Sequence, residues 1–402
     1  MKRPKQAIFL VGGRGTRLGA LSVDTPKPMQ EIAPGIRFLD ILLEHAARHG
    51  FTDIVLLAGH LGEKVEAAYH GKAVHEAKVR VLRELEPMGT GGALKLFADV
   101  LDPSFLLSNG DSFLDINLRE LTARPLGDSL ARLALRRVDD ISRFGSVALE
   151  GDRITAFLEK NAARGGPGLI NGGVYFLRRE IVSRLASPCS LEVDVFPMLA
   201  SEKSIEGTTF DGYFLDIGLP ETLAQAKAET AARRVKPAVI LDRDGVLNVD
   251  SGYTHKPEDL VWQPGTREAI RLLNDRGYYV IVATNQAGVA RGFYSEEAIA
   301  VFHAHMQEQL AEAGAHIDAF YHCPFHPEGK VDRYCVADHP DRKPNPGMIL
   351  RAFSEWPIDT SRSFLIGDRD SDIEAARRAG IPGYLYKGGD LAALVRSLIG
   401  ET

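Results

Sequence analysis

The stretch Ala7-Ile8-Phe9-Leu10-Val11-Gly12-Gly13-Arg14-Gly15-Thr16-Arg17 joins a short apolar run to a glycine-rich turn. This pattern predicts a buried strand that ends in a turn, where backbone N–H groups can approach a phosphate closely. Arg17, and Lys27 in the sequence Pro26-Lys27-Pro28, would add positive charge beside the β- and γ-phosphates of a nucleotide. Taken alone, the turn also fits a tight loop or a dinucleotide site, but Leu18 replaces the third glycine of the dinucleotide fingerprint.

A second apolar run, Ala238–Leu241, opens into Asp242-Arg243-Asp244-Gly245. In an extended segment, residues i and i+2 project to the same side, so the carboxylates of Asp242 and Asp244 should face one pocket. Neighbouring carboxylates repel unless a cation compensates, and a Mg²⁺ ion held by Asp242, Asp244 and Asp368 would do so. Asp242 would then be an ionised nucleophile, and Asp244 would protonate the leaving oxygen and later deprotonate water. A lone Asp-x-Asp also fits an Asx turn.

Length and composition restrict the class of protein. The chain has 402 residues, of which 45% are hydrophobic and 25% charged, so we expect two globular domains. A net charge of -6 argues against a nucleic-acid surface, and no apolar run is long enough to span a membrane. No signal-peptide core follows Met1-Lys2-Arg3-Pro4, which predicts a cytoplasmic location and small-molecule partners. The sequence leaves the oligomeric state open.

Apolar runs of strand length alternate with segments of helical spacing in both halves. This alternation predicts an α/β protein of two domains, each with a doubly wound, mostly parallel sheet. We expect residues 1–232 and 238–402 to form the domains, with 233–237 as linker, because Lys236-Pro237 interrupts an Ala- and Arg-rich helical segment, Pro220–Val235. The predicted strands besides the two quoted above are Ile54–Ala58, Val79–Leu82, Phe105–Ser108, Ala131–Arg136, Gly173–Leu177, Tyr278–Ala283, Ala319–Cys323 and Ser363–Ile366, and the predicted helices are Phe38–His49, Thr266–Arg276, Ser295–Ala313 and Asp370–Ala379.

Two carboxylates of the first half indicate a magnesium site. Asp111, in Asn109-Gly110-Asp111, ends the apolar run Phe105–Ser108, and Asp216 lies in Leu215-Asp216-Ile217-Gly218 before a predicted helix. Carboxylates at strand ends bind Mg²⁺, which would draw charge from a leaving pyrophosphate.

The order of motifs over residues 5–230 resembles that of the sugar-1-phosphate nucleotidyltransferases, and within them the D-glycero-α-D-manno-heptose 1-phosphate guanylyltransferases. Val11 departs from the alanine usual there. The resemblance implies a Rossmann-like domain in which Gly12, Gly13, Gly15, Thr16, Arg17 and Lys27 hold the triphosphate. It further implies that Glu86, Gly89 and Thr90 line the base and sugar region, that Glu159, Lys160 and Asn171 face the sugar phosphate, and that Asp111 and Asp216 hold Mg²⁺. The motifs that carry it are Gly-Gly-x-Gly-Thr-Arg, Pro-Lys-Pro, Glu86-Pro87-Met88-Gly89-Thr90-Gly91-Gly92, Asn-Gly-Asp, Glu159-Lys160, Asn171-Gly172-Gly173 and Asp-Ile-Gly.

Four ordered motifs over residues 238–390 resemble the haloacid-dehalogenase-like phosphatases. They are Asp242-Arg243-Asp244-Gly245, Thr284-Asn285, Lys343 in Arg342-Lys343-Pro344, and Gly367-Asp368-Arg369-Asp370-Ser371-Asp372. Val246 replaces the threonine of many relatives. The resemblance implies a capless Rossmannoid domain in which Thr284, Asn285 and Lys343 bind the phosphoryl group and Asp372 helps to place Lys343.

Two further stretches, Thr284–Gly292 and Cys323–Gly329, look like those of heptose 1,7-bisphosphate phosphatases, with histidinol-phosphate phosphatases as close cousins. Substrate selection would then rest on loops that carry Asn285, Arg291 and Arg342, and Arg291 is the candidate for the distal phosphate. Relatives often hold Zn²⁺ in this region. A site of Cys323, His326, Cys335 and His339 is chemically feasible, but its irregular spacing favours a loop without zinc.

The two halves together predict one polypeptide for two consecutive steps. The second half would remove the 7-phosphate of D-glycero-α-D-manno-heptose 1,7-bisphosphate, and the first would join the 1-phosphate to GMP from GTP, releasing pyrophosphate. Both would use Mg²⁺. One alternative keeps the chemistry but uses another sugar phosphate with UTP or CTP. In another, one half is a non-catalytic regulatory module, which the presence of every expected carboxylate and lysine disfavours.

Overall fold

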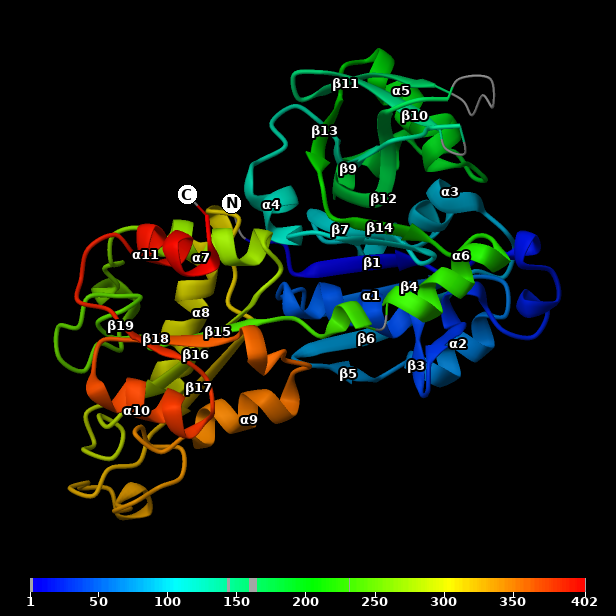
Figure 1. Ribbon diagram of the computed structural model, residues 1–402. Helices are drawn as coiled ribbons and strands as arrows, with labels where there is room; N and C mark the ends of the chain where they lie inside the picture. The colour runs from blue at the N-terminus through cyan, green and yellow to red at the C-terminus, as the bar shows by residue number, and fades with distance from the viewer. Residues whose placement is uncertain (1–2, 143–144, 159–164, 231, 402) are drawn as a thin grey trace. The chain divides into compact units, whose positions relative to one another are not determined.

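The computed structural model describes residues 3–142, 145–158, 165–230 and 232–401. The chain forms two compact units, unit 1 (Met1–Arg233) and unit 2 (Arg234–Thr402) (Figure 1). Each unit packs helices on both faces of a sheet, so the predicted two-domain α/β class is confirmed. No helix among the described residues is long and apolar enough to cross a membrane.

Unit 1 is built on a ten-stranded mixed sheet with the order β10-β11-β13-β9-β12-β7-β1-β4-β6-β5. Its parallel centre consists of β7 (Ser104–Asn109), β1 (Gln6–Leu10), β4 (Asp53–Ala58) and β6 (Ala77–Arg83). The long strand β12 (Gly168–Arg178) runs antiparallel to both of its neighbours, so the sheet is parallel at its centre rather than throughout. The other strands of the sheet are β5 (Ala73–Val74), β9 (Ala131–Val138), β10 (Ser146–Glu150), β11 (Arg153–Leu158) and β13 (Ile205–Phe210).

Two short ribbons complete unit 1. One pairs β8 (Ser112–Asp115) with β14 (Tyr213–Asp216), and the other pairs β2 (Glu31–Ala33) with β3 (Ile36–Arg37). The first ribbon aligns Ser112 with Asp216, which brings a late segment of the unit beside Asp111.

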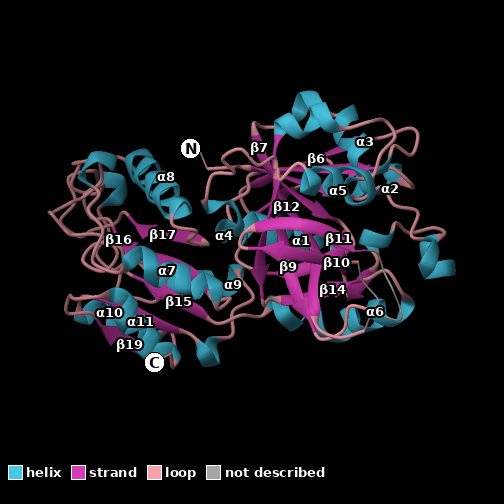
Figure 2. Cartoon of the chain, turned by 90° about the horizontal axis from the view of Figure 1, so that it is seen from above, coloured by secondary structure: helices cyan, strands magenta, loops and turns pink. Residues whose placement is uncertain are grey.

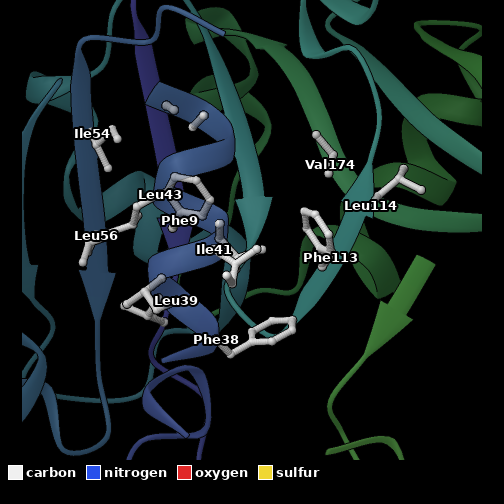
Figure 3. Close-up of a cluster of buried hydrophobic side chains, with 14 of the residues drawn as sticks. Phe9, Phe38, Leu39, Ile41, Leu43, Ile54, Leu56, Phe113, Leu114 and Val174 are labelled. Carbon is white, nitrogen blue, oxygen red and sulfur yellow. The ribbon is translucent and has the colours of Figure 1, made fainter. Parts of the chain in front are cut away.

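Strand alternation divides the core of unit 1 into two layers. Ala7 and Phe9 of β1 pack on one face with α1, whereas Ile8 packs on the other. Figure 3 shows Phe9, Ile54 and Leu56 facing the apolar side of α1. Burying each of these large side chains contributes about 1.5–3 kcal/mol. The first face holds α1 (Phe38–Arg48), α2 (Gly62–Tyr69), α4 (Leu118–Ala123) and α6 (Pro220–Gln225), and the second holds α3 (Gly89–Leu96) and α5 (Phe196–Ser201).

Unit 2 has a five-stranded, fully parallel sheet in the order β17-β16-β15-β18-β19. Figure 2 shows its strands flanked by helices. α7, α8 and α11 pack on one face, and α9 and α10 on the other. The bounds are β15 (Ala238–Leu241), α7 (Thr266–Asp275), β16 (Tyr279–Asn285), α8 (Glu296–Glu312), β17 (Ala319–Cys323), α9 (Gly347–Glu355), β18 (Phe364–Gly367), α10 (Asp370–Arg378), β19 (Gly383–Leu385) and α11 (Leu391–Ile399).

The strand order of unit 2 reverses between β15 and β18. At such a switch point the connections leave toward opposite faces, and a crevice opens at the carboxyl ends of the two strands. Asp242 follows β15, and its N–H donates to the carbonyl oxygen of Ile366 in β18 at 3.0 Å. Asp368 follows β18 directly, so the two aspartates of the predicted motifs meet at this crevice.

Candidate active sites

Unit 1 contains a cavity of about 550 Å³ at the carboxyl ends of β1, β4 and β6, a size within the usual range for small-molecule sites. Of the residues predicted for the nucleotide and sugar, Gly12, Gly13, Lys27, Glu86, Gly89, Thr90 and Asp111 line it. Arg14, which lies within the turn Gly12 to Arg17 predicted to hold the triphosphate, also lines it. Gly59, His60, Glu84, Asn109 and Glu192 line it as well, although the sequence motifs gave them no role.

The glycine-rich turn closes tightly on the segment after β4. A Cβ atom on Gly12 would lie 2.8 Å from Oε1 of Glu84 and 2.9 Å from the backbone nitrogen of Gly59, so no larger residue fits. Gly15 has a φ of 61° and precedes the 3₁₀ helix Thr16–Ser22, a backbone conformation that favours glycine.

Lys27 lies between the two carboxylates predicted to bind magnesium. Its Nζ is 2.6 Å from Oδ2 of Asp111 and 4.0 Å from Oδ1 of Asp216, and its side chain is 7% exposed. The hydroxyl of Ser112 donates to Asp216 at 3.1 Å. Nη2 of Arg17 approaches the same place, because a Cβ atom on Gly218 would lie 3.2 Å from it and 3.3 Å from Nζ of Lys27. Carboxylates are the oxygen ligands that Mg²⁺ prefers, and Lys27 and Arg17 lie beside these two with positive charge for phosphate oxygens.

A chain of hydrogen bonds extends from Asn171, predicted to face the sugar phosphate. Nδ2 of Asn171 donates to the Tyr175 hydroxyl at 2.9 Å, and that hydroxyl donates to Oε1 of Glu192 at 3.4 Å. The Thr90 hydroxyl donates to Oε2 of Glu192 at 2.9 Å. Tyr175 and Glu192 were not assigned from the sequence. Glu159 and Lys160 lie outside the described residues.

The carboxylate of Glu84 also lines the cavity, and the sequence motifs gave it no role. It directly follows β6, and burial raises its pKa above the ordinary value of 4.5. Its Oε2 accepts a hydrogen bond from the backbone N–H of Met88 at 3.4 Å. Its position after a central parallel strand was the available signal, because ligand-binding groups gather at such strand ends.

The centre of the unit 2 site is a buried lysine between two aspartates. Nζ of Lys343 lies 2.9 Å from Oδ1 of Asp242 and 2.7 Å from Oδ1 of Asp372, and both partners are at least 90% buried. Burial raises the pKa of Asp242 to about 6, although the Lys343 charge opposes that rise. Burial also lowers the pKa of Lys343, but the two aspartates outweigh it and hold that pKa above its usual value.

One oxygen of this site lacks a partner. Oδ1 of Asp368 is buried and accepts no hydrogen bond from the described residues, and burial raises the pKa of this carboxyl group. Asp242, Asp368 and Asp372 offer oxygen atoms that all lie within 4.8 Å of one another, a donor set that suits Mg²⁺. Gly245 has a φ of 90°, and a Cβ atom there would lie 2.3 Å from Oδ2 of Asp368.

Asp244 and Asn285 are engaged differently from what the motifs imply. Asp244 was predicted to bind magnesium, but among the described residues the oxygen cluster contains Asp242, Asp368 and Asp372 and not Asp244. The carboxylate of Asp244 instead accepts hydrogen bonds from Arg243, Asn248 and Gln286. The side chain of Asn285 binds the main chain of Lys343 twice, with Nδ2 donating at 3.0 Å and Oδ1 accepting at 3.1 Å. Asn285 therefore holds the loop that carries Lys343.

Arg291 and Arg342, predicted to select the substrate, lie near each other at the edge of this site. Nη1 of Arg291 donates to the Tyr253 hydroxyl at 2.7 Å, and Nη1 of Arg342 donates to the carbonyl oxygen of Phe325 at 3.0 Å. Burial, together with the positive charges of Arg291 and Arg369, lowers the pKa of Arg342. An anion bound here would relieve that repulsion.

The four side chains considered for zinc are not brought together. Within the described part of the chain, the cluster of metal-ligand side chains is that of Asp242, Asp368 and Asp372. The Cys335 thiol donates to the carbonyl oxygen of Pro327 at 3.1 Å, and Nδ1 of His326 accepts from the N–H of Glu328. Burial raises the pKa of the Cys323 thiol to about 11, which disfavours the thiolate that zinc requires.

The folds and sites define a two-domain α/β enzyme of phosphate chemistry. Residues 6–233 match the family model of nucleotidyl transferases, and residues 341–395 match that of HAD-hydrolase-like proteins. The chain therefore belongs to the nucleotidyl transferase family in unit 1 and, with the relatives described next, to the HAD-like phosphatases in unit 2.

The relatives agree with this division. A D-glycero-β-D-manno-heptose-1,7-bisphosphate 7-phosphatase of Rhodopseudomonas palustris is 49% identical over 173 residues, 43% of this chain and 95% of the relative. A D-glycero-α-D-manno-heptose-1,7-bisphosphate 7-phosphatase of Burkholderia mallei is 45% identical over 144 residues, 36% of this chain and 76% of the relative. The crystal structure of HddC from Yersinia pseudotuberculosis is similar to unit 1, with 30% sequence identity and a TM-score of 0.51. The match covers 57% of this chain and 100% of the HddC chain. HddC has also been solved in complex with GMP-PN.

Proposed function

We propose that this enzyme performs two consecutive steps in the synthesis of a GDP-heptose. Unit 2 would remove the 7-phosphate from heptose 1,7-bisphosphate, and unit 1 would transfer GMP from GTP to the resulting heptose 1-phosphate. The observation that carries the proposal is the pairing, in one chain, of a 7-phosphatase relative with a neighbour that binds a guanine nucleotide. The product of one reaction is the substrate of the other.

In the phosphatase step, Asp242 is the nucleophile. Its carboxylate oxygen bonds to phosphorus while the bond between phosphorus and the sugar oxygen breaks, and Asp244 gives that oxygen its proton. Water then attacks the same phosphorus and passes a proton to Asp244, and the bond to Asp242 breaks to release inorganic phosphate. Thr284 and Lys343 hold the phosphoryl oxygens, and the ion pair at 2.7 Å with Asp372 fixes Lys343.

In the transfer step, an oxygen of the sugar 1-phosphate attacks the α-phosphorus of GTP, and the bond to the pyrophosphate oxygen breaks. No covalent enzyme intermediate is needed. Lys27 and Arg17 stabilise the negative charge on the phosphates, and the backbone N–H groups of Gly12 to Thr16 orient them. The Asn171, Tyr175 and Glu192 chain offers acceptors and donors for sugar hydroxyls.

Magnesium fits both sites. Asp111 and Asp216 would hold it in unit 1, and Asp242 with Asp368 in unit 2, where it would neutralise phosphate charge. We propose that both reactions take place in the cytoplasm.

The base and the anomer are finer parts of the proposal. GTP is supported by the GMP-PN complex of HddC. The relatives are named for both anomers of the bisphosphate. We propose the α-anomer, because the motifs of unit 1 resemble those of α-heptose 1-phosphate guanylyltransferases.

The test is ³¹P NMR of the purified enzyme with Mg²⁺ and each anomer of heptose 1,7-bisphosphate, with GTP, ATP, CTP or UTP in turn. We expect the 7-phosphate signal of the α-anomer to disappear, and a diphosphate diester signal to follow only with GTP. Phosphate release without any nucleotide sugar would refute the transferase part. A diester with UTP or CTP alone would refute the base assignment.

A further inference from the structure

Arg243, which separates the two aspartates of the first phosphatase motif, is fully buried. Its guanidinium lies 4.7 Å from the centre of the Phe302 ring, and its Nη2 donates to the carbonyl oxygen of Thr254 at 2.6 Å. A buried guanidinium is costly unless its charge is paired. The carboxylate that pairs it is its own neighbour, Asp244.

Two nitrogen atoms of the Arg243 guanidinium donate to the Asp244 carboxylate in a forked arrangement. Nε donates to Oδ1 at 3.0 Å, and Nη2 donates to Oδ1 at 2.9 Å and to Oδ2 at 2.7 Å. Two amides add to it, with Nδ2 of Asn248 donating to Oδ1 and Nε2 of Gln286 donating to Oδ2, each at 2.9 Å. Both oxygens of Asp244 are thus held in position by donors from three residues.

Hydrogen bonds also hold the side-chain amide of Gln286 in position. Its Oε1 accepts from Nη2 of Arg243 at 3.1 Å and from the Tyr294 hydroxyl at 2.8 Å. Arg243 therefore restrains Asp244 twice, directly through the fork and indirectly through the amide of Gln286. Such a closed network of buried polar groups restricts its members to one arrangement.

We propose that Arg243 is a positioning residue of the phosphatase and that it acts through Asp244. It orients the Asp244 carboxylate, which exchanges a proton first with the sugar oxygen and then with water. This inference rests on the proposed phosphatase function. A guanidinium suits the task because its planar fork fixes the carboxylate's orientation, whereas the single ammonium of a lysine leaves the carboxylate free to rotate. No other reactant is needed, since the proton moves only between Asp244, the sugar oxygen and water.

The test compares two leaving groups. Heptose 1,7-bisphosphate releases an alkoxide that requires a proton, whereas p-nitrophenyl phosphate releases a phenolate that leaves without one. The ratio kcat/KM reports on steps up to formation of the aspartyl phosphate, so it contains the protonation of the leaving group. We expect Arg243→Lys to lower kcat/KM about 10- to 100-fold for the bisphosphate but less than about threefold for the aryl ester.

A double-mutant cycle separates this role from a purely structural one. In the background of Asp244→Asn, Arg243→Lys should cost no further kcat/KM on the bisphosphate, because the group through which it acts is absent. Equal losses on both substrates, or a full loss retained in the Asp244→Asn background, would overturn the inference. Arg132→Lys is the matched control, since Arg132 is a buried arginine (2% exposed) whose Nε and Nη2 bind Glu206 in unit 1, and it should leave the ratio unchanged.

Circular dichroism checks that Arg243→Lys folds. If it does not, Asn248→Ala removes one donor from Asp244 without touching Arg243's charge, and the same selective loss on the bisphosphate is expected. A wild-type enzyme that cleaves neither substrate would refute the proposed phosphatase and this inference together. A wild-type enzyme that cleaves both, with a substrate ratio unaltered by either variant, would refute the inference alone.

Discussion

Nζ of Lys27 lies 2.6 Å from Oδ2 of Asp111. The positive charge of the lysine therefore lies beside the carboxylate at which we expect a metal-bound triphosphate. Because Lys27 is buried and reaches both carboxylates, its loss should remove charge stabilisation from the phosphates and leave two carboxylates to repel them. We expect Lys27→Met to lower kcat of nucleotidyl transfer about 10²- to 10³-fold. Pyrophosphate release measures it, and an unchanged phosphatase rate is the control.

Asp242→Asn should abolish phosphatase activity, because an amide cannot form the aspartyl phosphate. We expect kcat to fall at least about 10³-fold, with nucleotidyl transfer to heptose 1-phosphate within about twofold of the wild type. Phosphate release and nucleotide-sugar formation are measured on the same preparation. Substantial residual phosphatase activity would mean that Asp242 is not the nucleophile.

Glu84→Gln should change the preference among nucleotides. Guanine presents a ring N–H and an amino group along one edge, and both donate, which suits a carboxylate. The amide of glutamine offers one acceptor and one donor, which suits uracil better. We expect the ratio of kcat/KM for GTP over UTP to fall about 10- to 100-fold. The matched variant is Glu86→Gln, an exposed carboxylate on the same cavity. If Glu86→Gln produces the larger change, Glu84 does not read the base.

Asp368→Asn should weaken magnesium binding in unit 2. Oδ1 of Asp368 has no hydrogen-bond partner among the described residues, and we expect it to be a ligand of the metal ion proposed for unit 2. We expect the Mg²⁺ concentration for half-maximal phosphatase activity to rise by roughly 10- to 100-fold. EDTA should stop both reactions of the wild type, and added Mg²⁺ should restore them. Activity that survives EDTA would contradict the metal assignment.

His303 should make unit 2 less stable in acid. Burial, and then the charge of Arg243, lowers the pKa of His303 well below 6.5, and its Nε2 lies 3.4 Å from Nη1 of Arg243, which can only donate. The unfolded chain therefore binds this proton more readily than the folded one. The stability associated with neutral His303 is present above pH 6.5 and declines as pH falls below it, by about 1.4 kcal/mol for each pH unit.

His303→Phe should reduce this acid sensitivity. The measurement is unfolding followed by tryptophan fluorescence between pH 7.5 and 5.5, because both tryptophans of the chain, Trp262 and Trp356, lie in unit 2. A pH dependence equal in the variant and the wild type would show that other groups cause it.

The sequence was most informative where apolar runs are short and continuous. Ile54–Ala58, Phe105–Ser108 and Val239–Leu241 all fall inside strands of the structure, because central strands are buried on both faces. The sequence did not predict β13, Ile-Glu-Gly-Thr-Thr-Phe, because polar residues and Gly207 lie between its two apolar ends. The predicted helix Pro220–Val235 is an α-helix only to Gln225 and continues as a π-helical turn.

The geometry of the candidate sites was likewise predictable from the sequence only in part. Asp242 and Asp368 could be placed together from sequence because both follow parallel strands, and parallel strands bring their carboxyl ends to one edge. The hydrogen bonds of Asp244 could not, because they depend on where Gln286 and Tyr294 come to lie after the chain folds. Glu192 likewise reaches Thr90 across 102 residues of sequence, a contact that no local pattern encodes.

The amide of Gln286 also sets the direction of one hydroxyl proton. Because Arg243 can only donate, Oε1 of Gln286 must face it, and Nε2 must then point toward Asp244 and Thr284. Oγ1 of Thr284 accepts that N–H at 2.9 Å, which leaves its own hydrogen available to donate to another acceptor. In the proposed phosphatase step, Thr284 would therefore meet the phosphoryl oxygen as a hydrogen-bond donor.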